Sequence, residues 1–193
     1  MLADLIKNYV TPLLKQHGFK KKGLTWNKSN DGFVQVVNFQ LSRFNSDVEK
    51  DFTINIGVFN SQVWKKCWGK EPPKVIKEED CFPRMRVGRL LNKPTDHWWT
   101  YDANTNDSGI GKEIKGILGE KCLPFLNAML DQNEVFRFYS VHTECLMLIE
   151  KVYLAIIKHD VGDVRYSEEL LSEIAVASKD WAKRVDQVRS QLS

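Results

Sequence analysis

The chain has 193 residues, of which 42% are hydrophobic and 27% are charged, so disordered, collagenous and membrane-spanning classes are excluded. This length predicts one domain, with or without a helical appendage, and a core large enough to need neither a metal ion nor disulfide bonds. With 28 basic and 25 acidic residues the net charge is +3, which does not require a polyanionic partner.

An amphipathic first helix is predicted by apolar residues at helical spacing: Leu2, Leu5, Ile6, Tyr9, Val10, Leu13 and Leu14. Gly18 is suited to end this helix, and Pro12 predicts a kink within it. Asp4 stands where a secretory signal carries positive charge, so we expect a helix and not a targeting segment. The sequence has no run of about 18 apolar residues, so no membrane association is expected.

Five strands are predicted downstream by alternating apolar and polar residues between turn sequences. They cover residues 19–27, 33–42, 52–59, 84–91 and 98–101. The first three follow one another closely and are expected to pair as an antiparallel meander. Residues 61–68, between the third and fourth strands, fit a short helix.

Helical periodicity replaces strand alternation after residue 104, predicting helices at 109–130, 145–158 and 167–192. Pro124 breaks or kinks the first, and the second is apolar nearly all round and is expected to be buried. Ser167 suits the N-cap of the third helix, whose acidic first turn and basic last turns match the helix dipole.

Strands followed by helices, without regular alternation, predict an α+β fold. We expect a four- to five-stranded antiparallel sheet with the N-terminal helix against it and a C-terminal helical layer. Residues 1–130 form the α+β domain in this prediction, and residues 131–193 form a helical extension packed on the same domain.

Charge divides unevenly between the two halves of the chain. Residues 1–102 hold 17 basic and 11 acidic side chains, net +6, and residues 103–193 hold 11 and 14, net −3. Two interpretations stay open: electrostatic fit of the two halves to each other, or a basic binding face on the sheet.

One face of the predicted sheet is rich in amide and guanidinium groups. Side chains alternate between the faces of a strand, and the polar sides of the central strands carry Asn38, Gln40, Ser42, Thr53, Asn55, Arg84 and Arg86, with Arg43 at the rim. Amides and guanidinium groups are directional donors, and arginine pairs with carboxylate or phosphate, so this set is a candidate binding site. The alternatives are a solvent-facing side of the sheet, or a side covered by the helices.

Several segments resemble an uncharacterised, mostly bacterial family, the domain of unknown function 4304. They are residues 18–26 (GFKKKGLTW), 36–43 (VVNFQLSR), 52–59 (FTINIGVF), 81–88 (CFPRMRVG) and the pair Trp98-Trp99. The similarity spans about residues 1–130 in matching order, and about the last sixty residues look like an extension. The resemblance implies a shared fold, and it implies no catalytic role because the family has no established activity.

No catalytic set, metal site or cofactor site is predicted. The spacing 109–114 (GIGKEI) lacks the third glycine of a dinucleotide loop and better fits a helix start. His142 and Cys145 lack a second pair of metal ligands, and a Cys81–His97 nucleophile pair would need contact in space. The four cysteines (Cys67, Cys81, Cys122 and Cys145) are widely spaced, which favours buried thiols and a reducing cytoplasm.

Two further features suggest partners. Five of the six tryptophans lie in the sheet half, some beside lysines, as in proteins that bind single-stranded nucleic acid, although core packing explains them as well. The residues Leu171, Ile174, Ser178, Trp181, Val185, Val188 and Leu192 alternate steps of three and four, as in a coiled coil. They predict either packing on the chain's own domain or a homodimer through the helix 167–192.

The leading functional hypothesis is a non-enzymatic binding module of the bacterial cytoplasm that docks a protein or peptide on the polar sheet face. An immunity- or antitoxin-like role is one form of it. The alternative is a nucleic-acid-binding protein that uses the basic sheet half, and an enzyme with an unidentified site comes third.

Overall fold

A computed structural model describes residues 2–140 and 146–192. The chain divides into two compact units, which we call the sheet unit (residues 1–58 and 76–127) and the helical unit (residues 59–75 and 128–193). The domain boundary predicted at residue 130 stays a prediction. That prediction placed residues 59–75 in the first domain, whereas in the structure they belong to the helical unit.

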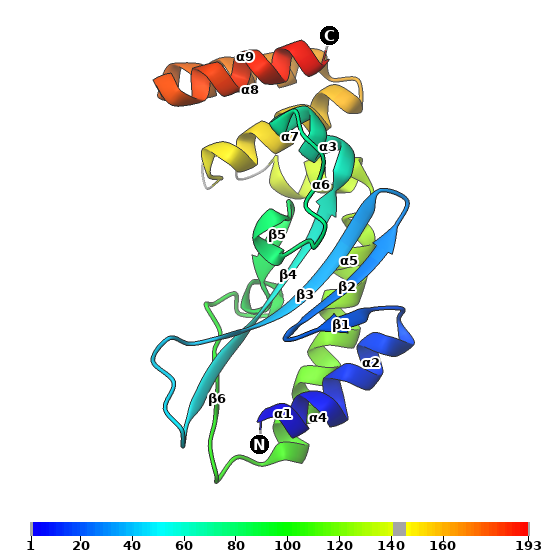
Figure 1. Cartoon of the computed structure of the whole chain (residues 1–193), viewed down its shortest axis with the longest axis vertical. Coiled ribbons are helices and arrows are strands. Elements are labelled where there is room, and N and C mark those ends of the chain that lie inside the picture. The colour runs from blue at the N-terminus through cyan, green and yellow to red at the C-terminus, as the bar shows by residue number, and fades with distance from the viewer. Residues whose placement is uncertain (1, 141–145, 193) are drawn as a thin grey trace. The chain divides into compact units, whose positions relative to one another are not determined.

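The sheet unit is built on a six-stranded antiparallel sheet, which confirms the α+β class (Figure 1). Its strands are β1 (Lys20–Lys22), β2 (Thr25–Asn30), β3 (Phe33–Leu41), β4 (Lys50–Asn60), β5 (Arg84–Arg86) and β6 (Trp99–Tyr101). The spatial order is β1-β2-β3-β4-β5, and β6 also pairs with β4. The predicted strand at 19–27 is two strands, because Gly23 adopts a positive φ of 62° and turns the chain into a hairpin.

The fourth predicted strand is shorter than expected. It ends at Arg86 and continues as a 3-10 helix, η3 (Val87–Leu90). The Gly88 carbonyl accepts hydrogen bonds from the amides of Thr95 and Leu91 at 3.2 and 3.4 Å, so it is used locally and extends no ladder. The predicted pairing of this strand with its neighbours is confirmed by the register of β5 against β4.

Each of the two helices with a predicted proline kink contains a π-helical segment just before the proline. The N-terminal helix runs as α1 (Leu2–Leu5), η1 (Ile6–Val10) and α2 (Thr11–Gln16), and the second as α4 (Asp107–Ile117), η4 (Leu118–Cys122) and α5 (Leu123–Ala128). Pro12 and Pro124 each follow the π segment by two residues. Proline lacks an amide hydrogen and its ring clashes with the preceding turn, and a wider turn accommodates both effects.

The apolar face of the sheet packs against these helices. A row of rings crosses it, with centroid distances of 5.4 Å for Trp26–Phe39, 5.7 Å for Phe39–Phe52 and 5.6 Å for Phe52–Trp99. On the same face Trp99 donates a hydrogen bond to Glu113 of α4 at 3.1 Å. Figure 1 shows α5 on the far side of β2 and β3, and Gln35 of β3 donates to Asn127 of α5 at 2.9 Å, so this face is the core of the sheet unit.

The helical unit contains α3 (Ser61–Trp68), α6 (Gln132–Tyr139), α7 (Leu148–Asp160), α8 (Val164–Ala177) and α9 (Lys179–Leu192). The expectation that residues 145–158 form a central buried helix is confirmed for α7, where Val152 to Lys158 are all buried. Trp68 of α3 donates a hydrogen bond to the Tyr153 hydroxyl of α7 at 2.8 Å. No helix in the described ranges is long and apolar enough to cross a membrane.

The prediction of one continuous helix over 167–192 with Ser167 as its N-cap is wrong, because α8 begins at Val164 and its N-cap is Asp163, whose side chain accepts a hydrogen bond from the Tyr166 amide. Ser178 is extended, with φ −158° and ψ 127°, and separates α8 from α9, which pack together as a hairpin. Arg189 of α9 pairs with Glu168 of α8 across it. Four apolar residues of the expected seam (Leu171, Ile174, Val185 and Val188) are buried, because folding back lets them pack within the chain, while Trp181 and Leu192 are half-buried. The homodimer stays a prediction, and four of the apolar residues expected at its contact are already buried within the chain.

The predicted charge asymmetry changes when charges are counted by unit. The sheet unit holds 16 basic and 13 acidic residues, net +3, and the helical unit holds 12 of each, net 0. The difference from the sequence halves arises largely because four lysines in residues 59–75 belong to the helical unit. The sheet unit is therefore only mildly basic.

Candidate functional site

The polar side chains predicted to share a face do share one. Asn38 lies opposite Thr25, Asn55 opposite Arg86, and Gly57 opposite Arg84 in the antiparallel ladders. Residues opposite each other point to the same side of a sheet, and every second residue of a strand follows them. We call this side, formed by Thr25, Asn38, Gln40, Thr53, Asn55, Arg84 and Arg86, the amide face.

Three carboxamides at its centre are joined by hydrogen bonds. The Asn55 Nδ2 donates to Gln40 Oε1 at 2.9 Å and, at 3.5 Å, to Asn38 Oδ1. The Asn38 Nδ2 donates to Thr25 Oγ1 at 2.9 Å. These bonds hold the side chains in one orientation, while the Gln40 amide nitrogen has no partner among the described residues.

Two loops border the amide face. On one side the Asn27 Nδ2 donates to the Ile76 carbonyl at 2.9 Å. The chain also passes so close to Gly57 that a Cβ there would lie 2.6 Å from Cys81 Cβ. On the other side Thr53 Oγ1 donates to the His97 carbonyl at 2.8 Å. Asn55, between these borders, is only 5% exposed.

The amide face is partly covered within the sheet unit, where Thr53 is fully buried and Asn55 is 5% exposed. Asn38 and Gln40 are half-buried, and the described helices of the unit attach to the opposite face through Glu113 of α4 and Asn127 of α5. The bordering loops therefore cover Thr53 and most of Asn55, and they leave Asn38 and Gln40 partly exposed.

Each arginine of the face is paired with a carboxylate from a bordering loop. Arg84 lies 3.4 Å from Glu78, and burial raises the pKa of that carboxyl while Arg84 opposes the rise. Arg86 holds both carboxylate oxygens of Asp96, at 2.5 and 2.6 Å, which lowers the pKa of Asp96. Its guanidinium carbon also lies 5.2 Å from the Trp98 ring centroid. Each pair is neutral overall and fixes the orientation of its arginine.

Two predicted site residues lie outside this network. The Ser42 Oγ accepts a hydrogen bond from the Phe44 amide at 3.2 Å and so shapes the turn after β3. Arg43 is exposed in the same loop, and no hydrogen bond or ion pair within the described ranges links it to the amides. The amide face thus includes six of the eight polar residues predicted to share it: Asn38, Gln40, Thr53, Asn55, Arg84 and Arg86.

The described cysteines are held as thiols. Burial raises the pKa of Cys67 and of Cys122 from 9.0 to about 12, and raises that of Cys81 as well. The Cys81 Sγ donates to the Lys77 carbonyl at 3.4 Å, and the His97 ring packs edge-on against Trp99 at 4.3 Å. A thiol must lose its proton to act as a nucleophile, so these environments disfavour cysteine catalysis.

Metal ligation finds no support in the described residues, where no group of three His, Cys, Asp or Glu side chains could hold an ion. The candidate pair His142 and Cys145 lies outside the described residues. The sequence GIGKEI lies in α4, whose N-cap is Asn106, so the helix interpretation of that segment is confirmed.

Sequence reasoning missed the partners of the arginines. Glu78 belongs to an acidic run that looks like an exposed loop, yet it is half-buried beside Arg84 in the 3-10 helix η2 (Glu78–Asp80). Asp96, near Trp98 in the sequence, carries no local signal for its pairing with Arg86. Neither pairing follows from spacing, because both depend on how irregular loops cross the sheet.

Comparison with protein families gave one match. A family model described as "Domain of unknown function (DUF4304)" matches residues 10–128. The comparisons with curated proteins and with solved structures gave no match. The matched range contains all of the amide face and none of α6 to α9.

Proposed function

The chain belongs to this family, whose description assigns no activity, and we propose that the protein is a non-enzymatic module that binds a segment of a partner protein on the amide face. The observation that carries the proposal is the row of hydrogen-bonded carboxamides, of which Asn38 and Gln40 are partly exposed, flanked by two oriented arginines. An immunity- or antitoxin-like role, in which the face covers and blocks a partner, is one form of this function.

A peptide fits the chemistry of the amide face. Carboxamides both donate and accept hydrogen bonds, as backbone groups and polar side chains of a partner do. The Asn55–Gln40 and Asn38–Thr25 bonds already restrict these side chains, so binding orders fewer rotamers and loses less entropy. The remaining donors of Arg84 and Arg86 suit a carboxylate or carbonyl of the partner.

Charge favours a protein partner over a nucleic acid. Affinity for nucleic acid comes mainly from uncompensated lysines and arginines that replace counterions along the phosphates. Both arginines of the amide face have a carboxylate neighbour, Glu78 or Asp96, and the sheet unit is net +3. We further propose a bacterial cytoplasmic setting, consistent with reduced cysteines whose burial keeps them protonated.

The test is site-specific photo-crosslinking in cells. A photoreactive amino acid replaces Ser42, which continues the strand row of Asn38 and Gln40, or replaces the exposed Lys112 of α4 as a control. We expect a partner to crosslink from position 42 and not from position 112.

Variants then identify the residues responsible. The double variant Arg84→Ala, Arg86→Ala should remove the crosslink from position 42. The matched double variant Lys112→Ala, Lys115→Ala removes the same charge from α4 and should leave the crosslink unchanged. Thermal unfolding confirms that both variants are folded. An unchanged set of partners with the arginine variant contradicts the proposal.

An oligonucleotide titration checks the other class of partner. Anisotropy with a fluorescent single strand, at low and high salt, should detect no binding that depends on Arg84 and Arg86. Affinity that falls steeply with salt and is lost in the arginine variant would replace the protein partner with a nucleic acid.

A further inference from the structure

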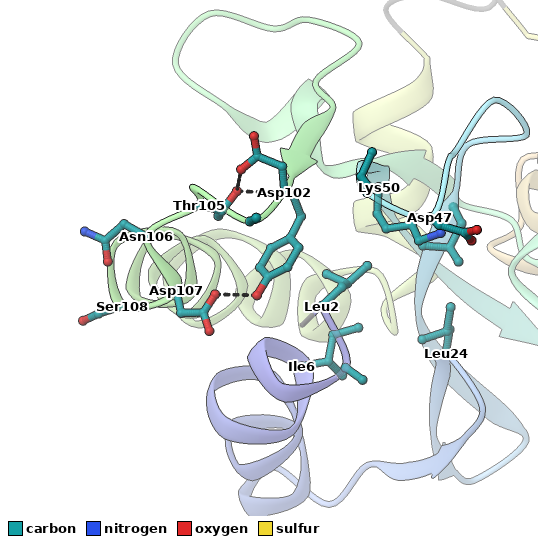
Figure 2. Close-up of a pocket in the computed structure, with 15 residues that line it drawn as sticks. Leu2, Ile6, Leu24, Asp47, Lys50, Asp102, Thr105, Asn106, Asp107 and Ser108 are labelled. Atoms are coloured by element: carbon teal, nitrogen blue, oxygen red, sulfur yellow. Dashed lines mark hydrogen bonds between the residues drawn. The ribbon is translucent and has the colours of Figure 1, made fainter.

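A pocket lies in the sheet unit beside the N-terminal helix. It has a volume of about 920 Å³ and is bounded by α1, the β3–β4 loop, β6 and the start of α4 (Figure 2). Leu41 and Tyr101, which line it, continue the strand rows of Phe39 and Trp99 on the apolar face. This pocket is therefore separate from the amide face.

The floor of the pocket is apolar. Leu2 of α1, Ile6 of η1 and Leu24 between β1 and β2 lie around the same space in Figure 2. The wall formed by the β3–β4 loop adds Leu41 and Val48, which are 40% and 80% exposed. Apolar side chains left in water beside a concave site gain free energy when a ligand covers them.

The rim of the pocket is acidic. Asp47, Asp102 and Asp107 line it, opposed by one cation, Lys50, whose amine donates to the Ser46 carbonyl. Asp107 accepts a hydrogen bond from the Tyr101 hydroxyl at 2.6 Å, and Asp102 accepts one from Thr105 at 2.8 Å. Both aspartates keep free oxygen lone pairs.

Asp47 is the most available of these carboxylates. It is exposed, and in the described part of the chain it has no hydrogen-bond or ion-pair partner. The lining thus has three acids and one base in a unit whose net charge is +3. The local sign is opposite to that of the unit, so the pocket selects for positive charge.

We propose that this pocket binds a small organic cation with an apolar body. The apolar part lies against Leu2, Ile6 and Leu24, and an ammonium or guanidinium group lies at the rim between Asp47 and Asp107. Small-molecule sites commonly have volumes of roughly 300–1,000 Å³, apolar walls and a few polar groups that orient the ligand. The pocket meets each of these conditions.

The probes for this site are three molecules that share one chain length: n-octylammonium, 1-octanol and octanoate. Each is titrated into the full chain by isothermal calorimetry, below its aggregation concentration. We expect octylammonium to bind about fivefold more tightly than octanol, as one partly exposed charge interaction of about 1 kcal/mol implies, and octanoate to bind weakest. Equal affinity for octylammonium and octanol, tighter binding of octanoate, or no binding of any probe overturns the proposal.

Charge variants assign the interaction to the rim. The double variant Asp47→Asn, Asp107→Asn keeps the side-chain shapes and should reduce the preference for octylammonium over octanol to about onefold. Glu49→Gln, in the same loop but outside the pocket lining, is the matched control and should keep the fivefold preference. A preference that survives in the double variant, or is lost equally in the control, contradicts recognition by the rim.

A steric variant tests the position independently of charge. Ala3→Trp introduces a large side chain on α1 at the pocket wall and should weaken octylammonium and octanol equally, by about tenfold or more. Arg84→Ala, on the amide face, should leave both affinities unchanged. Unchanged binding with Ala3→Trp would show that the probes bind elsewhere.

Discussion

The two faces of the same sheet are stabilised by different interactions. On the helix-covered face, stacked rings such as Phe39, Phe52 and Trp99 are almost fully buried and interact through packing. On the amide face, Asn38 and Asn55 interact through hydrogen bonds at a boundary with solvent. The comparison teaches that one strand pair supplies both a rigid core and a polar surface, because alternate residues serve each.

The largest expected effect comes from the centre of the packed face. Phe52→Ala removes a fully buried ring between Phe39 and Trp99, and we expect it to lower the free energy of unfolding by about 4 kcal/mol. Urea unfolding measures this loss. Gln40→Ala on the amide face is the comparison variant and should lose about 1 kcal/mol or less. Similar losses for the two variants would break the distinction between the faces.

Close approach of a loop to the amide face is tested at Gly57. Gly57→Ala places a Cβ within 2.6 Å of Cys81 Cβ, and we expect the clash to cost about 2 kcal/mol of unfolding free energy. Gly116→Ala in α4 is the matched control, because no atom lies within 4 Å of the added methyl group. It should stabilise the protein by about 0.5–1 kcal/mol through helix propensity. Opposite signs in thermal or urea unfolding are the expected outcome.

The carboxamide network is expected to contribute less than the rings. Asn55→Ala removes two hydrogen bonds and should lower the free energy of unfolding by about 1–2 kcal/mol. A double-mutant cycle with Gln40→Ala measures the coupling between the two side chains, which should be about 0.5–1 kcal/mol. Strict additivity would show that the amides do not act together.

The dependence of the free energy of unfolding on alkaline pH tests how fully the Cys122 thiol is buried. The Cys122 pKa is raised from 9.0 to about 12 by burial, so above pH 9 the unfolded chain loses a proton that the folded chain retains. Stability is therefore fully present below pH 9 and falls as pH rises toward 12. At pH 10 this thiol should cost about 1 kcal/mol relative to pH 8. Cys122→Ala should show a decline smaller by that amount, and an equal decline would contradict the burial of the thiol.

The smallest effect is expected at Gln35, a buried amide on the packed face. Gln35 is 1% exposed and donates to Asn127 at 2.9 Å, while its Oε1 is buried without a partner among the described residues. Gln35→Met removes that oxygen and should change the free energy of unfolding by only about 0.5 kcal/mol, toward greater stability. A loss of 2 kcal/mol in urea unfolding would show that this face also depends on hydrogen bonds.

Local sequence was sufficient where alternation acts within one strand, but it misplaced the start of α8, whose N-cap is Asp163 and not Ser167. The polar rows of β3 and β4 follow from their period of two. Pro12 and Pro124 predict an irregularity in each helix, and the structure shows its form to be a π-helical segment. The break at Ser178 escaped prediction, because a three-four pattern of apolar residues is equally compatible with a straight helix and with a hairpin. The split at Gly23 escaped for a similar reason, since the residues on both sides of it favour strands.

The sequence by itself determined the α+β class and which side chains of each central strand share a face, because side-chain direction in a strand is a local property of the backbone. Only the tertiary structure decided that Arg84 faces Glu78, that Arg86 faces Asp96, and that acids gather around the pocket beside α1. Those neighbours come from loops far apart in the sequence. Their positions depend on the packing of the whole sheet unit, which no local pattern records.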